Sequence, residues 1–310
     1  MIIFRGMAHL PLIFCLASAP LLAQHLTVSA GSLVHIRAFP SDEIDTRDVL
    51  VWLPEGYTPQ RRYPVLYMQD GQMLFDATVT WNQQEWGVDE TMDLLIREGR
   101  IREAIVVGIF NHQDKRALEY IPQKPLDTLS QEEIALLKAK PDPRVPRVLS
   151  GLFESDAYLR FLVHELKPYI DSHYSTLPDR ANTLVAGSSM GGLISLYAIC
   201  EYPEIFGAAA CLSTHWTGIF RAEDNPLPAR FMAYLADHLP DPATHRLYFD
   251  HGTETLDALY GPFQAEADRL VAERGYKDDQ VMSRVFPGTN HSEDAWRARL
   301  SIPLTFLLAP

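Results

Sequence analysis

The sequence lacks the residue patterns that hold metal ions and nucleotides. No Cys-x-x-Cys or His-Glu-x-x-His occurs, and the 11 histidines are scattered rather than clustered at ligand spacing. Neither Gly-x-x-x-x-Gly-Lys nor Gly-x-Gly-x-x-Gly is present, so nothing supports nucleotide binding. We therefore expect neither a metal ion nor an organic cofactor.

Positive charge is also scarce. The chain has 27 Lys and Arg against 40 Asp and Glu, which gives a formal net charge of −13. This balance argues against nucleic acid and anionic membrane surfaces as main partners and suits a freely diffusing protein. With 310 residues and 47% hydrophobic composition, the chain can bury a large core without disulfide staples. Its length alone permits one or two domains, and its oligomeric state stays open.

No apolar run is long enough to be a confident membrane span. Arg5 precedes the longest apolar run, Leu10 to Ala23, which has the length of a signal-peptide core. We predict that residues 1–23 are a signal peptide cleaved after Ala23, with retention as an anchor as the alternative. The mature protein, residues 24–310, would then be periplasmic or extracellular and would have no membrane contact.

Cysteine is rare, with three residues in the chain. Cys15 leaves with the predicted signal peptide, so Cys200 and Cys211 remain. Export would permit a disulfide between them, but both fall in apolar elements where buried free thiols are equally expected. The sequence leaves this alternative open.

Apolar runs of strand character alternate with stretches of helical spacing along most of the chain. The expected strands are 25–39, 49–53, 63–68, 104–109, a run from Leu184, 207–212, 246–249 and 280–286. The expected helices are 88–97, 130–139, 155–173, 193–202, 228–238, 263–274 and 292–308. The pattern predicts an α/β fold with a mostly parallel sheet flanked by helices, in a single domain over residues 24–310.

The segment 111–151 interrupts this alternation. It carries Pro122, Pro125, Pro141, Pro143 and Pro146 around one short helical candidate. So long a connection between regular elements is usually functional or disordered. It is either a lid over the site or a variable surface insertion, and the sequence does not decide between them.

The stretch Leu184 to Gly192 carries the strongest functional signal. An apolar strand ends in Gly-Ser-Ser-Met-Gly and a helical stretch follows, which is the pattern of a nucleophile elbow, Gly-x-Ser-x-Gly. The residues two before and two after the nucleophile nearly touch in such a turn and must be small. Ser189 meets this requirement, whereas Ser188 would have the bulky Met190 two residues after it. We therefore predict that Ser189 is the nucleophile.

A histidine and an acid follow in the order expected of an α/β-hydrolase, each after a strand. His291 follows the last strand, so we predict that it is the general base. The preceding strand ends in a loop with several carboxylates. We prefer Glu254, at the apex of this loop, as the acid that orients the histidine, with Asp257 as the alternative.

Ester hydrolysis also needs two backbone donors for the developing oxyanion. We expect one to be the N–H of Met190, directly after the nucleophile, and the other to be the N–H of Gln72, after the third strand. Candidate substrate-binding residues are Asp70, Trp81, Trp86, His215 and Trp216. Tryptophans in such loops could stack on a sugar or an aromatic acyl group, but aromatic residues near a loop more often pack in the core or at the rim.

These residues resemble the esterase family of α/β-hydrolases, which includes esterase D, antigen 85 mycolyltransferases, enterochelin esterases and feruloyl esterases. The resemblance runs from about Val49 to the end and is carried by the motifs 64–72, 86–92, 165–170, 186–192 and 252–254. It implies a serine hydrolase without a cofactor, in which Ser189, Glu254 and His291 match the triad positions. Two departures are Thr255, where members often carry Asp, and Asn290, where many carry Gly.

The sequence thus predicts an exported serine esterase that acts on a carbohydrate-linked, phenolic or siderophore ester, a small molecule or a carbohydrate. The alternative is an acyltransferase that uses the same triad to move an acyl group to a sugar. A peptidase would need a peptide-binding edge that the sequence does not indicate. A non-catalytic binding protein is disfavoured because the elbow and the histidine are both intact.

Overall fold

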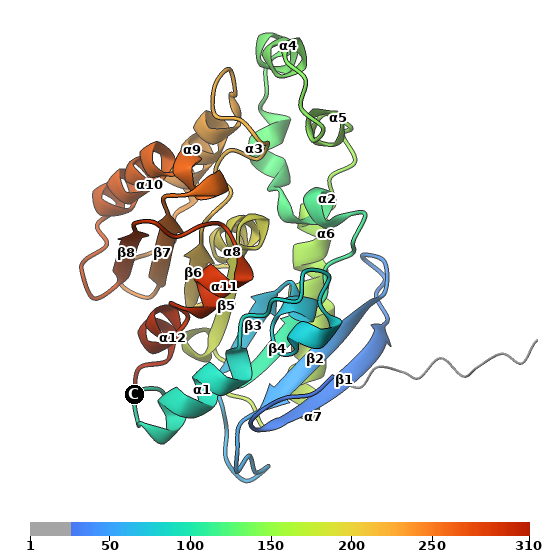
Figure 1. Ribbon diagram of the computed structural model, residues 1–310, viewed down its shortest axis with the longest axis vertical. Helices are drawn as coiled ribbons and strands as arrows, with labels where there is room; N and C mark the ends of the chain where they lie inside the picture. Colours follow the sequence, from blue (N-terminus) through green and yellow to red (C-terminus); the bar gives the residue numbers. More distant parts are fainter. Residues whose placement is uncertain (1–25) are drawn as a thin grey trace, which may run out of the picture.

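The computed structural model describes residues 26–310, so the predicted signal peptide, residues 1–23, lies outside the described residues. Within residues 26–310, eight strands form one sheet in the order β1-β2-β4-β3-β5-β6-β7-β8 (Figure 1). The strands are β1 (Ser32–Phe39), β2 (Arg47–Leu53), β3 (Val65–Gln69), β4 (Ile105–Ile109), β5 (Thr183–Ser188), β6 (Ala208–Leu212), β7 (Arg246–Gly252) and β8 (Val281–Phe286). β1 pairs antiparallel with β2, and β2 pairs antiparallel with β4. All the other neighbouring strands, from β4 and β3 through to β7 and β8, pair in parallel.

The strands in the middle of the sheet are apolar at almost every position because helices cover both of their faces. Every residue of β3, β4, β5 and β6 is buried, whereas β8 at the edge has no buried residue. A strand covered on one face only would alternate apolar and polar residues instead. The predicted α/β architecture with a mostly parallel sheet is confirmed.

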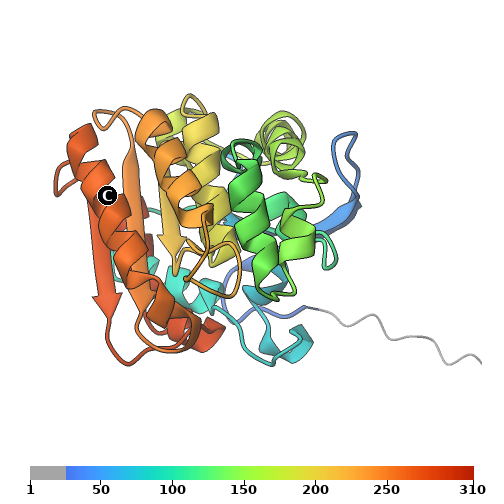
Figure 2. The same cartoon turned by 90° about the horizontal axis from the view of Figure 1, so that it is seen from above.

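The sheet divides the core into two layers. One face packs against α1 (Val88–Arg97), α11 (Glu293–Arg297) and α12 (Ser301–Leu308). The other face packs against α6 (Ser155–Arg160), α7 (Lys167–His173), α8 (Met190–Glu201), α9 (Leu227–His238) and α10 (Gly261–Arg274). Figure 2 shows α10 and α9 (orange), α8 (yellow) and helices of the 111–151 segment (green) side by side.

Outside the 111–151 segment, the helices agree with the sequence pattern except at two places. The expected helix 155–173 is interrupted by a π-helical stretch, Phe161–Leu166, between α6 and α7. The expected helix 292–308 is two helices, α11 and α12, separated near Leu300. Both deviations leave the apolar faces on the sheet, so the period of the sequence pattern does not reveal them.

The segment 111–151 forms four short helices that pack into the core. They are α2 (Arg116–Tyr120), α3 (Gln123–Asp127), α4 (Gln131–Ala139) and α5 (Val145–Val148). Tyr120, Leu126 and Leu137 from this segment are buried in the same core as the sheet. Glu119 pairs with Arg47 of β2 at 2.8 Å, and both side chains are buried. The segment is therefore an integral part of the fold, with α4 and α5 at its upper edge in Figure 1.

Cys200 and Cys211 are both buried free thiols, so the structure has no disulfide between them. In the part of the chain that the structure describes, none of the helices has the length and apolarity needed to cross a bilayer.

Candidate active site

Ser189 occupies the sharp turn between β5 and α8. Its backbone has φ 56° and ψ −124°, a conformation that non-glycine residues adopt only where the surroundings impose it. A Cβ on Gly187 would lie 2.6 Å from the carbonyl carbon of Gly191, so these two positions touch and exclude larger residues. The structure thus places Ser189, and not Ser188, in the strained turn.

The surroundings hold this turn rigidly. The Ser189 N–H donates to the Leu212 carbonyl at 2.9 Å, and the Ser189 carbonyl accepts from the His215 N–H at 3.1 Å. The first eleven residues of α8 are all buried, so the helix cannot shift without disturbing the core. Met190 is the first residue of α8, a position whose N–H has no acceptor inside a helix and lies at the positive end of the helix dipole.

A cleft of about 890 Å³ opens where the carboxyl ends of the parallel strands meet. Ser189 and His291 both line it, although they are a hundred residues apart in sequence. The loop after β3 and the 111–151 segment line the cleft with the polar residues Asp70, Gln72, Asn111, Gln113, Arg116 and Arg144. Its aromatic lining consists of Trp81, Trp86, Phe110, Phe220 and Trp296.

Asp257, and not Glu254, is the carboxylate that holds His291. The Asp257 Oδ1 atom lies 2.5 Å from Nδ1 of His291, and Asp257 is only 1% exposed. Glu254 is exposed to solvent. The structure therefore places the alternative acid, Asp257, and not the preferred Glu254, beside His291.

The backbone between these two acids explains the difference. After β7 the chain enters a short 3-10 helix, Thr255–Leu259, with Thr255 at φ 54°. This turn sends the chain back toward the sheet, so Asp257 points inward while Glu254 stays at the loop apex. The hydroxyl of Thr255 also accepts from the His291 N–H at 2.9 Å, which ties the acid loop to the histidine loop.

Ser213, directly after β6, supports Asp257, and the sequence interpretation missed it. The Ser213 hydroxyl donates to Asp257 Oδ2 at 2.6 Å, and the Gly252 N–H donates to the same oxygen at 2.6 Å. Burial alone would raise the pKa of this carboxyl. The hydrogen bonds and charge attraction of His291, together with these two donors, hold the pKa below its ordinary value. The position of Ser213 at the end of a parallel strand was the one signal available.

The Ser213 hydroxyl is itself held from two sides. It accepts from Nε1 of Trp296 at 3.0 Å and from Nη2 of Arg299 at 2.9 Å. Arg299 also pairs with the buried Asp250 at 2.9 Å. The orientation of the Asp257 carboxylate is thus fixed by residues from β6, β7 and the C-terminal helices.

Gln72 lies where the sequence places the second oxyanion donor, in the 3-10 turn Gly71–Met73 beside the cleft. Gly71, directly before Gln72, has no room for a side chain. A Cβ at Gly71 would lie 2.4 Å from the carbonyl carbon of Gly108 in β4. Glycine therefore lets this loop lie directly on the neighbouring strand.

Asp70 borders the cleft but is already paired. Its carboxylate accepts from Arg116 at 2.7 and 2.6 Å and from the Asn111 amide at 2.6 Å. Arg116 begins α2, so this pair fastens the 111–151 segment to the loop after β3. Burial alone would lower the pKa of the Arg116 guanidinium, but the charge of Asp70 and the hydrogen bonds to it raise this pKa above its usual value, which keeps the pair charged.

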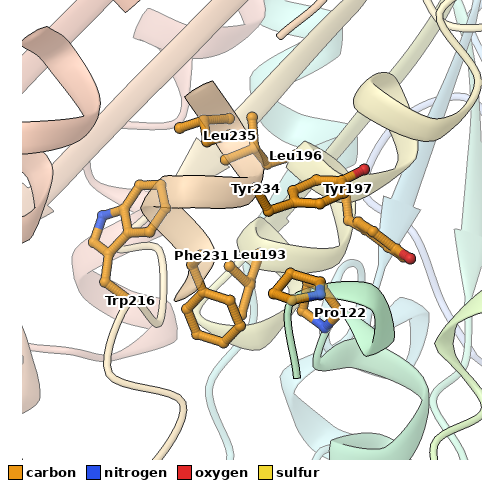
Figure 3. A pocket seen from close by; sticks show the side chains of 9 residues that line it. Pro122, Leu193, Leu196, Tyr197, Trp216, Phe231, Tyr234 and Leu235 are labelled. Carbon is orange, nitrogen blue, oxygen red and sulfur yellow. The ribbon is translucent and has the colours of Figure 1, made fainter. Parts of the chain in front are cut away.

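The candidate aromatic residues divide into two groups. Trp81 is 82% exposed at the rim of the cleft, and Trp86 is buried in its wall against Trp296, with ring centroids 5.6 Å apart. His215 and Trp216 are buried outside the cleft, so the expectation that they line it is wrong. Trp216 donates from Nε1 to Gln264 at 3.0 Å and borders a small apolar gap between α3, α8 and α9 (Figure 3).

No three His, Cys, Asp or Glu side chains of residues 26–310 converge as they would around a metal ion.

The parallel sheet, the serine turn after β5 and the histidine after β8 define an α/β-hydrolase. The profile of the Esterase family ("Putative esterase") matches residues 44–131 and 146–307, and the chain belongs to this family. The resemblance seen in the sequence is thereby confirmed. As a member of this family, the protein is a carboxylic ester hydrolase.

Individual relatives are distant. YbbA, an uncharacterized protein of Bacillus subtilis (strain 168), is 22% identical over 253 residues, which are 79% of this chain and 86% of YbbA. A ferulic acid esterase structure is 20% identical with a TM-score of 0.63, covering 89% of this chain and 98% of that one. The enterobactin esterase FES from Shigella flexneri is 17% identical with a TM-score of 0.63, covering 91% of this chain and 60% of FES.

Proposed function

We propose that the protein is an exported serine esterase in which Ser189 is the nucleophile, His291 the general base and Asp257 the acid that orients it. One observation carries the proposal. Ser189 in its strained turn and His291 on a buried carboxylate open onto the same cleft. A nucleophile, a base and an orienting acid from three separate loops are what acyl transfer requires.

In the acylation step, Ser189 Oγ attacks the carbonyl carbon of the ester while its proton passes to Nε2 of His291. Because Nδ1 bonds to Asp257, Nε2 is the nitrogen that remains to act as base. The tetrahedral intermediate then breaks its bond to the alcohol oxygen, which leaves with the proton that His291 held. Ser189 keeps the acyl group as an ester.

Water completes the reaction by the same route. It attacks the acyl-enzyme while His291 takes its proton, and the proton returns to Ser189 Oγ as the acid leaves. In both steps the carbonyl oxygen becomes negative and is bound by the N–H groups of Met190 and Gln72. The helix dipole of α8 favours the same charge.

The cleft supports a substrate with an aromatic or sugar part. Trp81, which is 82% exposed at the rim, offers a ring surface on which a phenolic acyl group or a sugar can stack, whereas Trp86 and Trp296 are buried in the wall. Among the related proteins are a ferulic acid esterase and an enterobactin esterase. We infer a phenolic, carbohydrate-linked or siderophore ester as the substrate.

Export and domain organisation complete the proposal. Residues 1–23 act as a signal peptide, and residues 24–310 fold as a single domain that diffuses freely in the periplasm or outside the cell. Neither nucleic acid nor a cofactor takes part.

Replacing each serine of the elbow tests the proposal. Ser189→Ala should reduce hydrolysis of p-nitrophenyl acetate by at least about 10³-fold, the usual effect of losing a triad member. Ser188→Ala, the matched control, should keep most of the activity. Full activity in Ser189→Ala would refute the proposal.

Product analysis with a sugar acceptor separates hydrolysis from the alternative, acyl transfer, in which the acyl group appears on the sugar.

A further inference from the structure

The loop 70–73, which carries the proposed oxyanion donor Gln72, is held by residues of the 111–151 segment. The Asp70 carboxylate accepts from Nε and Nη2 of Arg116 at 2.7 and 2.6 Å, so the two side chains form a bidentate pair. Its Oδ1 atom also accepts from the Asn111 amide at 2.6 Å. The backbone N–H of Asn111 donates to Oε1 of Gln72 at 3.2 Å. The segment thus holds the loop at both Asp70 and Gln72.

Asp70 has a backbone conformation that its surroundings must hold. Its φ of 56° and ψ of 46° lie in the left-handed region, which residues other than glycine seldom adopt. The side chains of Arg116 and Asp70 are only 24% and 12% exposed, so water competes little for their pair. Bidentate bonds between charged groups fix the plane of the carboxylate as well as its distance. The pair therefore holds the residue from which the turn Gly71–Met73 begins.

Asp70 also lies against the serine turn. A Cβ on Gly191 would lie 3.2 Å from Oδ2 of Asp70, and Gly191 directly follows Met190, the other proposed oxyanion donor. Tyr120 of α2 is fully buried and supports both partners of the ion pair. Its hydroxyl accepts from the Asp70 N–H at 3.4 Å, and its ring centroid lies 5.3 Å from the Arg116 guanidinium. Asp70 is thus adjacent to both chain segments that carry the proposed donors.

We propose that Asp70, Arg116 and Asn111 are positioning residues that hold the N–H of Gln72 in place for the oxyanion. The proposal rests on the proposed function, in which the N–H groups of Met190 and Gln72 bind this charge. Such donors stabilise the transition state most when they are already in place, because no free energy is then spent on moving them. Both oxygens of Asp70 are occupied by the 111–151 segment, so Asp70 acts through the loop.

Asp70→Asn tests this role with little change in shape, because asparagine also adopts the left-handed conformation readily. Its amide cannot accept the bidentate pair, so the loop loses its restraint. Asp70→Asn and Arg116→Met should each lower kcat for p-nitrophenyl acetate at least about tenfold, but less than the about 10²- to 10³-fold loss of a whole donor. KM should stay within about twofold, because the oxyanion exists only in the transition state and intermediates.

A trifluoromethyl ketone inhibitor gives a readout that a purely structural role would not move. The ketone forms a tetrahedral adduct with the serine, and the adduct oxygen carries the charge that the two N–H groups bind. Its inhibition constant should rise in Asp70→Asn and in Arg116→Met by about the factor by which kcat/KM falls. An unchanged inhibition constant beside a lowered kcat would contradict the positioning role.

The double variant Asp70→Asn with Arg116→Met shows whether Arg116 acts through Asp70. If it does, replacing Arg116 in the Asp70→Asn protein should lower kcat by less than about twofold further. Losses that multiply in the double variant would mean that Arg116 contacts the substrate directly. That result would overturn the positioning role of Arg116.

Arg230→Met is the matched control. Arg230 forms the same kind of bidentate pair, with Nε and Nη2 at 3.0 and 2.5 Å from Glu133 of α4, which also belongs to the 111–151 segment. This variant should keep the wild-type kcat and inhibition constant. If Arg116→Met does not fold, Asn111→Ala takes its place, because it removes one of the bonds to Asp70 and leaves the ion pair intact.

The elbow variant separates the two possible failures. Wild-type kcat and inhibition constants in Asp70→Asn and Arg116→Met, together with an inactive Ser189→Ala, would overturn the positioning role alone. If Ser189→Ala is fully active, the proposed function fails, and the positioning role fails with it.

Discussion

At the scale of single residues, a site residue can be predicted from the sequence only where its position shows that its side chain faces inward at the end of a strand. Ser189 and His291 are recognisable because each belongs to a short motif with a fixed position relative to a strand. Asp257 is not, because its loop holds several carboxylates and only the turn beginning at Thr255 decides which of them is buried. His215 illustrates the same limit, because its place after β6 does not reveal that its side chain is fully buried.

The two acids of this loop provide a matched pair of substitutions. Asp257→Asn should lower kcat about 10³- to 10⁴-fold, because the amide no longer favours the His291 tautomer that leaves Nε2 basic. Glu254→Gln should change kcat by less than about twofold, because Glu254 is exposed to solvent. The measurement is the steady-state rate with p-nitrophenyl acetate. A larger loss in Glu254→Gln would return the role to Glu254.

At the scale of elements, the sequence pattern predicts the strands and long helices well. Helix 88–97 is predicted with both of its ends correct, because Gly87 and Gly99 flank it and its apolar spacing is regular. The helices of the 111–151 segment are harder to predict from the sequence, because only α4 has a clear capping signal, Ser130 with Glu133. The π-helical stretch at 161–166 has no composition of its own, so no sequence rule identifies it.

The segment that precedes β1 is fastened to the body of the protein by carboxylates. Asp89 of α1 accepts from the backbone N–H of Ser29 at 2.6 Å and of Ala30 at 3.3 Å. Asp76 accepts from the backbone and the hydroxyl of Thr27. Burial raises the pKa of Asp89 to about 6, whereas the hydrogen bonds that Asp76 accepts lower its pKa despite burial.

This difference predicts a pH dependence of stability. Between the ordinary Asp pKa, about 4, and about 6, folded Asp89 keeps its proton while the unfolded chain releases it. The free energy of unfolding should therefore decrease as pH rises through this window. Asp89→Asn should remove this component, and Asp76→Asn, the control, should retain it. Urea unfolding at pH 4 to 7 measures the slope, and an equal slope in wild type and Asp89→Asn would contradict the account.

At the scale of the whole molecule, the sheet brings together residues that lie far apart in the chain. The loops after β5, β6, β7 and β8 supply Ser189, Ser213, Asp257 and His291. The loop after β3 and the connection after β4, which includes the 111–151 segment, also line the cleft. No one of these loops holds the site alone, so activity should depend on the intact fold.

The central claim is that Ser189 forms an acyl-enzyme in the folded protein. The most direct measurement mixes the protein with p-nitrophenyl acetate, quenches it in acid within the first turnovers and maps acetylated peptides by mass spectrometry. Native protein should carry one stoichiometric acetyl group on Ser189, and urea-unfolded protein should carry none on Ser189. An acetyl group on Ser188, or turnover without any acetylated serine, would contradict this claim.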